Sequence, residues 1–466
     1  MAGGSIAVLD VGKTLSKLTL WKADGALIER RTRRNERVIH QGWAVLDTTG
    51  IENWLADTLR DFAGLSEIAA IVPVGHGAAV ALLRDGRLVA PPLDYEQPLP
   101  EGDYDSQRDG FGATGSPPLP GGLNIGAQLH ALEAHDPSLL KGATILPWAQ
   151  YWAWLLCGIA ASEVTSLGCH SDLWRPLANA PSALAVRRGW AARLAPLRPA
   201  SDVLGTLTPA WAARTGLPAS VRVYCGLHDS NAALLAARGF AEIAEREATV
   251  LSTGTWFVAM RSPARDAAVM PLPAARDCLI NVDVRGRPIP SARWMGGREA
   301  EILMGIDTRD GDLAAGRGID ALPRVLAEGH MLLPGFAPGT GPFPAGEGRW
   351  LDGEPADPAL RRAAVHLYLA LMTDVSLGLI GTRERLLVEG RFAEAGLFVR
   401  ALAALRPDLS IYAANSHNDV SYGARRLLQP DLAPLSALTR VAPLDHDLVE
   451  YRARWSREAE RAGRTA

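Results

Sequence analysis

The chain has 466 residues, which is too long for one hydrophobic core and favours two large domains. Apolar residues make up 48% and charged residues 21%, as in soluble globular proteins, and the formal net charge of -3 gives no support for nucleic-acid binding. The four cysteines lack metal-binding or disulfide spacing and no apolar run approaches a membrane span, so we expect a cytoplasmic protein with free thiols.

The chain starts with a predicted β-hairpin around a turn that contains glycine and threonine. Residues 5–9 are an apolar run, and residues 15–21 are apolar or β-branched at alternate positions, which is typical of a strand. The turn itself, residues 10–14, also fits a relaxed Walker A motif in which Lys13 would bind phosphate. A Walker A loop must be followed by a helix. The alternating pattern after Thr14 instead predicts a strand, a turn and a second strand.

Several residues of this turn could contact phosphate. Asp10 could hold Mg²⁺ through water, because that ion prefers carboxylate oxygen, or it could simply form an Asx turn. Gly12 permits close approach of the backbone, and the hydroxyl of Thr14 adds a hydrogen-bond donor. Lys13 and Lys17 could neutralise phosphate charge, or they could be exposed strand residues.

The rest of the first half reads as alternating helices and strands. Helices are predicted at 51–62, 123–135 and 230–238, and strands at 68–74 and 221–225. The last of these strands runs into Cys225-Gly226-Leu227-His228-Asp229. Asp229 could accept the proton of a substrate hydroxyl that attacks a phosphoryl group, or it could only cap the helix.

A second strand-turn-strand unit is predicted at residues 248–260. Its turn contains Thr253, Gly254 and Thr255, so two similar turns could grip a triphosphate from both sides. The remainder alternates again, with helices at 361–380, 394–405 and 419–428 and strands at 386–388 and 409–413. Gly390 lies where a strand gives way to a helix, and the Gly- and Pro-rich residues 332–348 predict a long surface loop.

The order and spacing of these motifs resemble the FGGY carbohydrate kinases of the actin-like ATPase superfamily, over nearly the whole chain. The family's Asp-x-Gly-x-Thr turn matches residues 10–14, its Gly-x-x-Asp motif matches residues 226–229, and its second phosphate turn matches residues 252–255. The Ser-x-Gly-Thr-Trp form of that turn looks most like the rhamnulokinase branch. The resemblance implies an α/β fold of two actin-like (ribonuclease H-like) domains, 1–240 and 241–466, with a catalytic cleft between them.

The resemblance also implies the chemistry. It implies phosphorylation by Mg·ATP of a hydroxyl of a ketose, either a 6-deoxyketohexose or a pentulose, or of a polyol, with Asp229 as general base. The candidate sugar-binding residues are His76, Gly77, His170, Asp172, His228 and Trp256. The candidate ATP-binding residues are Asp10, Gly12, Lys13, Thr14, Lys17, Thr253, Gly254, Thr255 and Gly390. No protein-only metal site is expected, and the partners are small molecules, with no nucleic acid and no membrane, for a monomer or homodimer.

The chain also departs from the family pattern. The usual Gly-Gly pair of the adenosine motif is replaced by Glu389-Gly390, so ATP could bind in a modified pose or another nucleotide could be preferred. Gln150 stands where most members have aspartate. Two alternatives stay open: a catalytically silent actin-like sensor of sugar or nucleotide, and a P-loop NTPase that uses Lys13.

Overall fold

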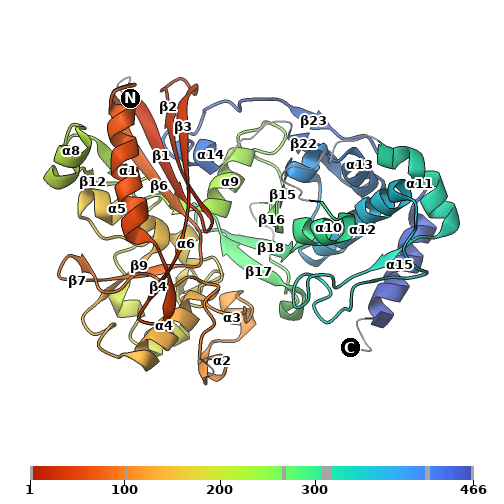
Figure 1. The fold of residues 1–466 in the computed structure, drawn as a ribbon, viewed down its shortest axis with the longest axis horizontal. Coiled ribbons are helices and arrows are strands. Elements are labelled where there is room, and N and C mark those ends of the chain that lie inside the picture. Colours follow the sequence, from red (N-terminus) through yellow and green to blue (C-terminus); the bar gives the residue numbers. More distant parts are fainter. Residues whose placement is uncertain (1–3, 101, 265–268, 307–316, 415–419, 463–466) are drawn as a thin grey trace. The chain divides into compact units, whose positions relative to one another are not determined.

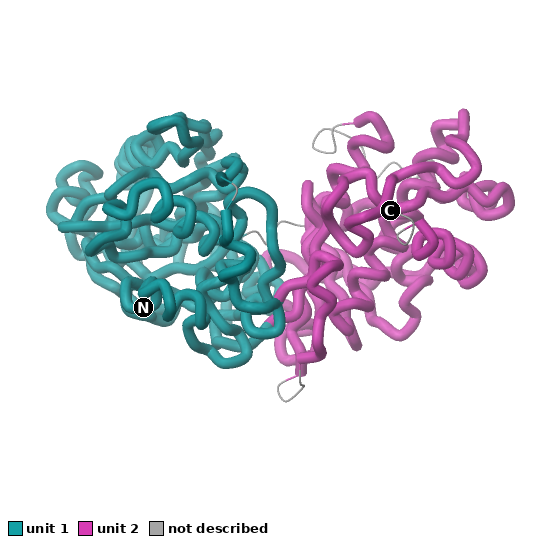
Figure 2. Tube along the Cα trace, turned by 90° about the horizontal axis from the view of Figure 1, so that it is seen from below, with its two compact units in different colours: residues 1–239, 280–288, 418–433 teal, residues 240–279, 289–417, 434–466 magenta. Residues whose placement is uncertain are grey.

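The computed structural model describes residues 4–100, 102–264, 269–306, 317–414 and 420–462 of the chain. The chain forms two compact units, which are coloured separately in Figure 2. Unit 1 comprises residues 1–239, 280–288 and 418–433, and unit 2 comprises residues 240–279, 289–417 and 434–466. Unit 1 is therefore discontinuous in sequence, because two segments from the second half of the chain complete it.

Unit 1 is built on a seven-stranded sheet with strand order β12-β13-β6-β1-β2-β3, and β14 also pairs with β6 (Figure 1). Its strands are β1 (Ser5–Val11), β2 (Leu15–Trp21), β3 (Leu27–Arg34), β6 (Ile68–Gly75), β12 (Val203–Thr206), β13 (Arg222–Tyr224) and β14 (Leu227–His228). β1 runs antiparallel to β2 and parallel to β6, and β14 also runs parallel to β6. The predicted N-terminal hairpin is thus confirmed.

No helix follows the first turn. Residues 15–21 form β2, which pairs with β1 so that Lys17 lies opposite Asp10. A Walker A loop depends on a helix whose N-terminal amide groups converge on phosphate. The P-loop NTPase alternative is therefore wrong, since the chain continues past Thr14 as an antiparallel strand.

Helices cover both faces of this sheet, which is why β1 is buried at every position. Alternate residues of β1 point to opposite faces, so Leu9 packs in a cluster with residues of two helices and Val8 packs in a second cluster on the other side. The helices of the first cluster are α1 (Thr48–Ala63) and α5 (Trp148–Cys157), and those of the second are α9 (Asp229–Ala237) and α14 (Val420–Arg425).

Shorter elements complete unit 1. The helices are α2 (Tyr104–Gln107), α3 (Phe111–Thr114), α4 (Ile125–His135), α6 (Val164–Leu167), α7 (Ala183–Arg187), α8 (Pro209–Thr215) and the 3₁₀ turn η1 (Ala191–Arg193). The strands are β4 (Arg37–His40), β5 (Trp43–Leu46), β7 (Val80–Arg84), β8 (Arg87–Leu88), β9 (Thr144–Pro147), β10 (Trp174–Arg175) and β11 (Ala180–Pro181). Of these, β8, β7 and β9 form a separate three-stranded sheet.

Unit 2 repeats the central arrangement of unit 1. Its sheet has the order β17-β18-β16-β15-β21-β22-β23, in which β15 runs antiparallel to β16 and parallel to β21. The strands are β15 (Ala248–Thr253), β16 (Phe257–Ser262), β17 (Cys278–Val282), β18 (Pro288–Trp294), β21 (Arg385–Gly390), β22 (Ser410–Ala414) and β23 (Leu438–Arg440). This arrangement confirms the second predicted strand-turn-strand unit and the α/β class.

The remaining elements of the second half are mostly helical. They are α10 (Gly296–Met304), α11 (Arg317–Glu328), α12 (Pro358–Leu379), α13 (Gly396–Leu405), α15 (Val449–Ala462), the 3₁₀ turns η2 (Ala274–Arg276) and η3 (Arg391–Glu394), and the short strands β19 (Leu332–Leu333) and β20 (Arg349–Trp350). The predicted helices differ from the observed ones mainly at their ends, and residue 419 of one prediction lies outside the described residues. No helix within the described ranges is long and apolar enough to cross a bilayer.

Helix α14 comes late in the sequence but packs directly on α9. The two helices approach so closely at Gly423 that a Cβ atom there would lie 1.7 Å from the carbonyl oxygen of Ala232. On its other side, α14 places the fully buried ring of Tyr422 against Trp21, with ring centroids 5.8 Å apart. The late segment is therefore part of the core of unit 1.

Gly423→Ala tests this contact. The added methyl group meets backbone rather than a flexible side chain, so we expect the variant to lose about 1–3 kcal/mol or more of unfolding free energy, seen as a lower calorimetric midpoint for unit 1. Gly112→Ala is the matched control, because Gly112 also lies in a helix of unit 1 but a Cβ atom there meets nothing within 4 Å. Equal midpoints for the two variants would contradict the close packing of α14 on α9.

Candidate functional site

Three parallel strands of unit 1 end side by side. In the register of the sheet, Val11 of β1 lies beside Gly75 of β6, and Gly75 lies beside His228 of β14. Carboxyl ends of adjacent parallel strands form a common edge, where α/β proteins place their ligands. Asp10, His76 and Asp229 belong to these three strand ends and so gather at one edge of the sheet.

Glycine is required where the chain turns toward Asp229. Gly226 has φ +76°, and a Cβ atom there would lie 2.0 Å from the carbonyl oxygen of Pro73 on β6. The Gln150 side-chain amide donates to the carbonyl oxygens of Cys225 (3.2 Å) and Gly226 (3.1 Å), which ties α5 to the same bend. The bend directs the chain into α9, whose first residue is Asp229.

The simple capping role for Asp229 is wrong. The N-cap position is occupied by His228, and Asp229 lies within the first turn of α9. Its Oδ1 atom accepts hydrogen bonds from the Ser230 amide (2.6 Å), from Nε2 of His228 (3.1 Å) and from the Ser230 hydroxyl (3.3 Å). These contacts all reach Oδ1, and Oδ2 takes none from the part of the chain that the structure describes.

The surroundings of Asp229 favour its ionised form. Burial by itself would raise the pKa, but the electrostatic interaction and hydrogen bond with His228, together with the effects of His76 and the Ser230 amide, outweigh burial and lower the pKa of Asp229 from 3.8 to about 2. The side chain keeps 29% of its surface exposed. Asp229 is therefore a carboxylate at neutral pH, with one oxygen held in place and the other available to a ligand.

His76 supplies a donor beside this carboxylate. Burial lowers the pKa of His76 to about 4, so the ring is neutral at physiological pH. Its Nδ1 atom accepts from the Ala78 amide at 3.3 Å, so the proton resides on Nε2, which is buried and has no partner among the described residues. Buried donors are normally satisfied, and a hydroxylated ligand could satisfy this one.

Gly77 lets neighbouring groups approach. A Cβ atom on Gly77 would lie 2.2 Å from the sulfur of Cys169 and 3.0 Å from Nε2 of His228. A side chain at this position would therefore clash with the sulfur of Cys169 and crowd the imidazole of His228. The structure thus brings Asp10, Lys17, His76, Gly77, His228 and Asp229 into one region of unit 1.

The two lysines of the first turn have different partners. Lys17 lies 3.2 Å from Asp10, consistent with the register of the hairpin. Lys13 instead forms an ion pair with Asp94 and lies 4.8 Å above the ring of Tyr95, and that ring also packs against His76, with ring centroids 5.6 Å apart. A phosphate contact for Lys13 stays a prediction, whereas its observed contacts place it beside the wall formed by Tyr95 and His76.

The surroundings of Asp10 suit Mg²⁺ bound together with water and phosphate better than a metal ion bound by protein side chains alone. Asp10 is 5% exposed, and no cluster of three or more His, Cys, Asp or Glu side chains suitable for a metal exists among the described residues. Mg²⁺ keeps several waters and typically uses one or two carboxylates together with phosphate oxygens. A single buried carboxylate at a strand end is compatible with that mode of binding.

His170 and Asp172 belong to a more tightly satisfied loop. Both have left-handed backbones, with φ of 52° and 62°. Asp172 accepts from the Tyr104 hydroxyl at 2.6 Å and from Arg108 at 2.7 Å, and its side chain is fully buried. Nδ1 of His170 lies 2.8 Å from the carbonyl oxygen of Leu123. These contacts hold the loop in place, and the predicted sugar contacts of both residues stay predictions.

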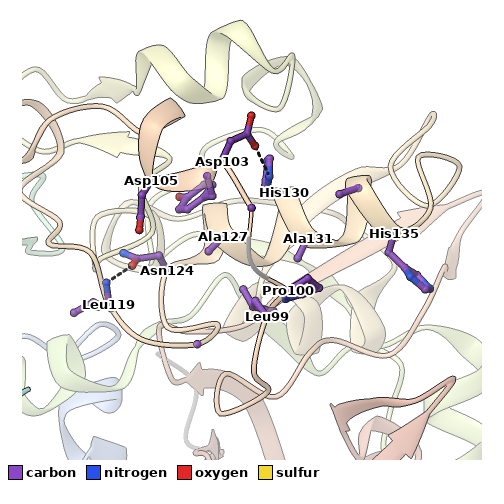
Figure 3. A pocket seen from close by; sticks show the side chains of 14 residues that line it. Leu99, Pro100, Asp103, Asp105, Leu119, Asn124, Ala127, His130, Ala131 and His135 are labelled. Carbon is purple, nitrogen blue, oxygen red and sulfur yellow. Dashed lines mark hydrogen bonds and ion pairs between the residues drawn. The ribbon is translucent and has the colours of Figure 1, made fainter.

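A cavity of about 770 Å³ lies along one face of α4 (Figure 3). Tyr104 and Asn124 line it, and His130 and Asp103 form an ion pair of 3.3 Å within it. None of the predicted site residues lines this cavity. Two of its lining residues contact the loop of His170 and Asp172: Tyr104 bonds to Asp172, and the Asn124 side-chain amide donates to the carbonyl oxygen of His170 at 2.9 Å.

In unit 2 the second turn is tied to the end of β21. The Thr253 hydroxyl donates to the carbonyl oxygen of Glu389 at 2.6 Å and accepts from the Phe392 amide at 3.1 Å. Gly390 has φ +84°, and a Cβ atom there would lie 2.2 Å from the carbonyl oxygen of Thr253. The structure thus brings the second turn and Gly390 together, with the Thr253 hydroxyl engaged in holding them.

The N-terminus of α10 packs against the same turn. A Cβ atom on Gly297 would lie 2.0 Å from the carbonyl oxygen of Gly254, and the Arg298 amide donates to the carbonyl oxygen of Thr255 at 3.3 Å. Trp256 follows the turn with Arg293 5.0 Å from its ring. Trp256 therefore belongs to unit 2, while the other predicted sugar contacts belong to unit 1.

Glu389 is the main departure in this region. Its carboxyl group accepts from the Ser252 hydroxyl at 2.5 Å, and burial raises its pKa from 4.5 to about 7, although the Ser252 hydrogen bond opposes the shift. The sequence marked Glu389 as unusual, but no pattern indicated that Ser252 would be its partner.

One functional residue of unit 1 was missed by sequence reasoning. Glu163 is fully buried and accepts from the Thr165 hydroxyl at 2.5 Å, while the same hydroxyl accepts from the His228 amide at 3.0 Å. Glu163 thereby fixes the backbone that carries His228 and Asp229. The sequence held one local sign of Glu163, namely its position two and three residues before Thr165 and Ser166. Its side chain accepts from the amides of these two residues and so caps α6.

The chain is similar in sequence and structure to known carbohydrate kinases. A family model described as "Carbohydrate kinase FGGY, C-terminal domain" matches residues 245–435. The crystal structure of a carbohydrate kinase from Novosphingobium aromaticivorans is 54% identical, covers 99% of this chain and 100% of its own, and has a TM-score of 0.93. No curated protein matches the chain.

More distant solved structures share the fold. A xylulose kinase from Rhodospirillum rubrum is 19% identical, with a TM-score of 0.78 over 99% of this chain and 98% of its own. A glycerol kinase from Plasmodium falciparum, solved with ADP, is 12% identical, with a TM-score of 0.77 over 98% of both chains.

The carboxyl group of Glu163 gives a prediction for stability. Burial raises its pKa from 4.5 to about 7, although hydrogen bonds from Thr165 and Ser166 oppose the shift. Between these two pH values the folded state keeps a proton that the unfolded state has released, so stability falls as pH rises. We expect the unfolding free energy to fall by roughly 3 kcal/mol by pH 7. Glu163→Gln should flatten the dependence of the unfolding free energy on pH, as measured by unfolding experiments from pH 5 to 8. Parallel slopes for both proteins would contradict the assignment.

Proposed function

Because this chain belongs to the FGGY family of carbohydrate kinases, we propose that it transfers the γ-phosphoryl group of ATP to a hydroxyl of a ketose or polyol, with Asp229 as general base. The observation that carries the proposal is the arrangement at Asp229. The carboxylate is ionised, Oδ1 is held by three donors, and Oδ2 is left for a substrate hydroxyl.

The reaction needs only a weak base. The substrate oxygen forms a bond to the γ-phosphorus, the bond from that phosphorus to the leaving oxygen of ADP breaks, and the hydroxyl proton passes to Oδ2 of Asp229. In a loose transition state the hydroxyl loses its proton late, when the new bond has already made it acidic. A carboxylate with a pKa of about 2 can therefore accept it.

The sugar would be oriented by groups at the same edge. The unpartnered Nε2–H of His76 is suited to donate to a sugar oxygen, and the ring of Tyr95 closes the side next to it. His170, Asp172 and Trp256 are retained as proposed sugar contacts. The fold shared with a xylulose kinase supports a pentulose, and the Trp256-containing turn supports a 6-deoxyketohexose as the other candidate.

The phosphates would be held by both turns. Asp10 would hold Mg²⁺ through water and Lys17 would lie beside it, while Gly12 and Thr14 allow the backbone of the first turn to approach phosphate. When bound, Mg²⁺ would neutralise phosphate charge. In unit 2, the nucleotide would lie against the turn of residues 253–255, Gly390 and the N-terminus of α10, which pack together.

A catalytically silent sensor is the second candidate. The observation that favours it is the buried pair of Glu389 and Ser252, which places a carboxyl group where the family has glycine. Sugar-dependent release of ADP would exclude it.

Asp229→Asn tests the proposed mechanism. We expect kcat to fall roughly 10²–10⁴-fold, because the amide cannot accept the proton, while sugar binding measured by calorimetry is retained. The assay is ADP release over a panel of ketoses, deoxyketoses and polyols with Mg·ATP and Mg·GTP. Asp57→Asn is the matched control, since Asp57 is an exposed carboxylate of unit 1, with 71% of its side-chain surface accessible. An Asp229→Asn variant with nearly full activity would rule out Asp229 as the base.

Lys13→Met separates a sugar-side role from a phosphate role. Because Lys13 pairs with Asp94 and lies over Tyr95, we expect the KM for sugar to rise about tenfold, equivalent to about 1.4 kcal/mol, with the KM for ATP nearly unchanged. Lys17→Met is the matched comparison and should affect ATP use instead, since Lys17 lies beside Asp10. A rise confined to the KM for ATP in Lys13→Met would show that Lys13 binds phosphate.

A further inference from the structure

Three side chains at the start of α9 form a linear hydrogen-bonded series. Nδ2 of Asn231 lies 3.4 Å from Nδ1 of His228, and Nε2 of His228 lies 3.1 Å from Oδ1 of Asp229. His228 is 6% exposed and Asn231 is 2% exposed, so water does not easily replace either contact. The residues at 228 and 231 are three apart, which puts them on the same side of the first helical turn.

The order of donors and acceptors in the series is fixed from one end. An ionised carboxylate only accepts hydrogen bonds, so Nε2 of His228 must carry the proton that reaches Asp229. Nδ2 of Asn231 is the amide atom that faces Nδ1, and an NH₂ group only donates, so Nδ1 is the acceptor and carries the lone pair. Asn231 therefore donates to His228, and His228 donates to Asp229.

The opposite orientation would disrupt the site. If the Asn231 amide were reversed, its oxygen would select the tautomer with the proton on Nδ1, and the lone pair of Nε2 would face the carboxylate of Asp229. The observed orientation leaves Oδ1 of Asn231 buried and without a partner among the described residues. No described residue bonds to the oxygen of the Asn231 amide. The contact between Nδ2 and His228 therefore sets the orientation of this amide.

Other ionisable groups surround His228. Asp229 lies next to it on α9, His76 follows β6, Glu163 precedes α6, and the thiol of Cys169 lies near Gly77. Apart from Asp229, these groups leave the ring nitrogens of His228 uncontacted; Glu163 acts on the backbone of His228 through Thr165. Among the described residues, Asn231 is the group that contacts Nδ1.

We propose that Asn231 is a positioning residue for phosphoryl transfer, which holds His228 in the Nε2–H tautomer so that His228 occupies Oδ1 of Asp229 and leaves Oδ2 to accept the substrate proton. The proposal rests on the proposed function for its kinetic part. The tautomer of His228 is a property of the resting protein and can be measured independently of activity.

Two substitutions in the full chain test the proposal. Asn231→Leu keeps the size of the side chain but removes the donor, so we expect kcat to fall roughly 10–100-fold, as for other residues that orient a functional imidazole, with the KM for sugar little changed. Asn231→Asp keeps the shape but offers a carboxylate to Nδ1. His228 should then hold protons on both nitrogens, and the pH profile of kcat should differ from that of wild type.

Nitrogen-15 NMR of histidine-labelled protein supplies the readout that does not depend on catalysis. The His228 signals, assigned by their loss in His228→Gln, should show the Nε2–H tautomer in wild type, a mixture in Asn231→Leu and an imidazolium in Asn231→Asp. If Asn231→Leu does not fold, the wild-type spectrum and the isosteric Asp variant decide the question.

The outcomes separate the two proposals. An Nδ1–H tautomer or an imidazolium in wild type at neutral pH, or an unchanged kcat and pH profile in both variants, would overturn the role of Asn231. Absence of ADP release with every sugar, together with the Nε2–H tautomer and the expected change in Asn231→Leu, would overturn the proposed function while supporting the positioning of His228 by Asn231.

Discussion

The candidate site depends on the way β6 is paired on both of its edges. Because β1 and β14 both run parallel to β6 with ends in register, the residues that follow these strands meet at one edge of the sheet. The pairing with β14 requires the chain to pass over Pro73 at a distance that only glycine permits, at Gly226. A single steric constraint on the backbone therefore sets where Asp229 lies relative to Asp10.

The charge of each buried group at this edge depends on how many hydrogen bonds that group receives. Asp229 receives three donors on one oxygen and stays ionised, whereas Glu163, which is more deeply buried, has one oxygen without a partner among the described residues and a pKa near neutrality. His76 is kept neutral by burial. The result is a fixed negative charge at Asp229 beside the neutral donor of His76, an arrangement consistent with the proposed binding of an uncharged sugar.

Features set by local sequence were predictable, and features set by distant contacts were not. The hairpin of residues 5–21 follows from side-chain alternation, and the bend before Asp229 follows from a glycine at a strand end. The ion pair between Lys13 and Asp94 joins residues 81 positions apart, and nothing in the loop around Asp94 distinguishes that carboxylate from a solvated one.

The same limit applies to whole elements. The helix at 420–425 fits the alternating pattern of the second half, so the sequence gives no sign that it packs in unit 1. The capping interpretation of Asp229 failed by a single residue, since a cap at 229 needs a helix that begins at 230, whereas α9 begins at 229 and its N-cap is His228. Sequence patterns locate a strand end well but do not resolve which of two adjacent residues caps the helix after it.

The packing of α14 on α9 has a consequence for how the protein is made. The helix that carries Asp229 is complete after residue 237, yet its neighbour in the core is synthesised almost two hundred residues later. On a ribosome that adds roughly 5–20 residues per second, the apolar side of α9 stays uncovered for about 10 seconds or more. The core of unit 1 is therefore completed around α9 only when the second half of the chain has emerged.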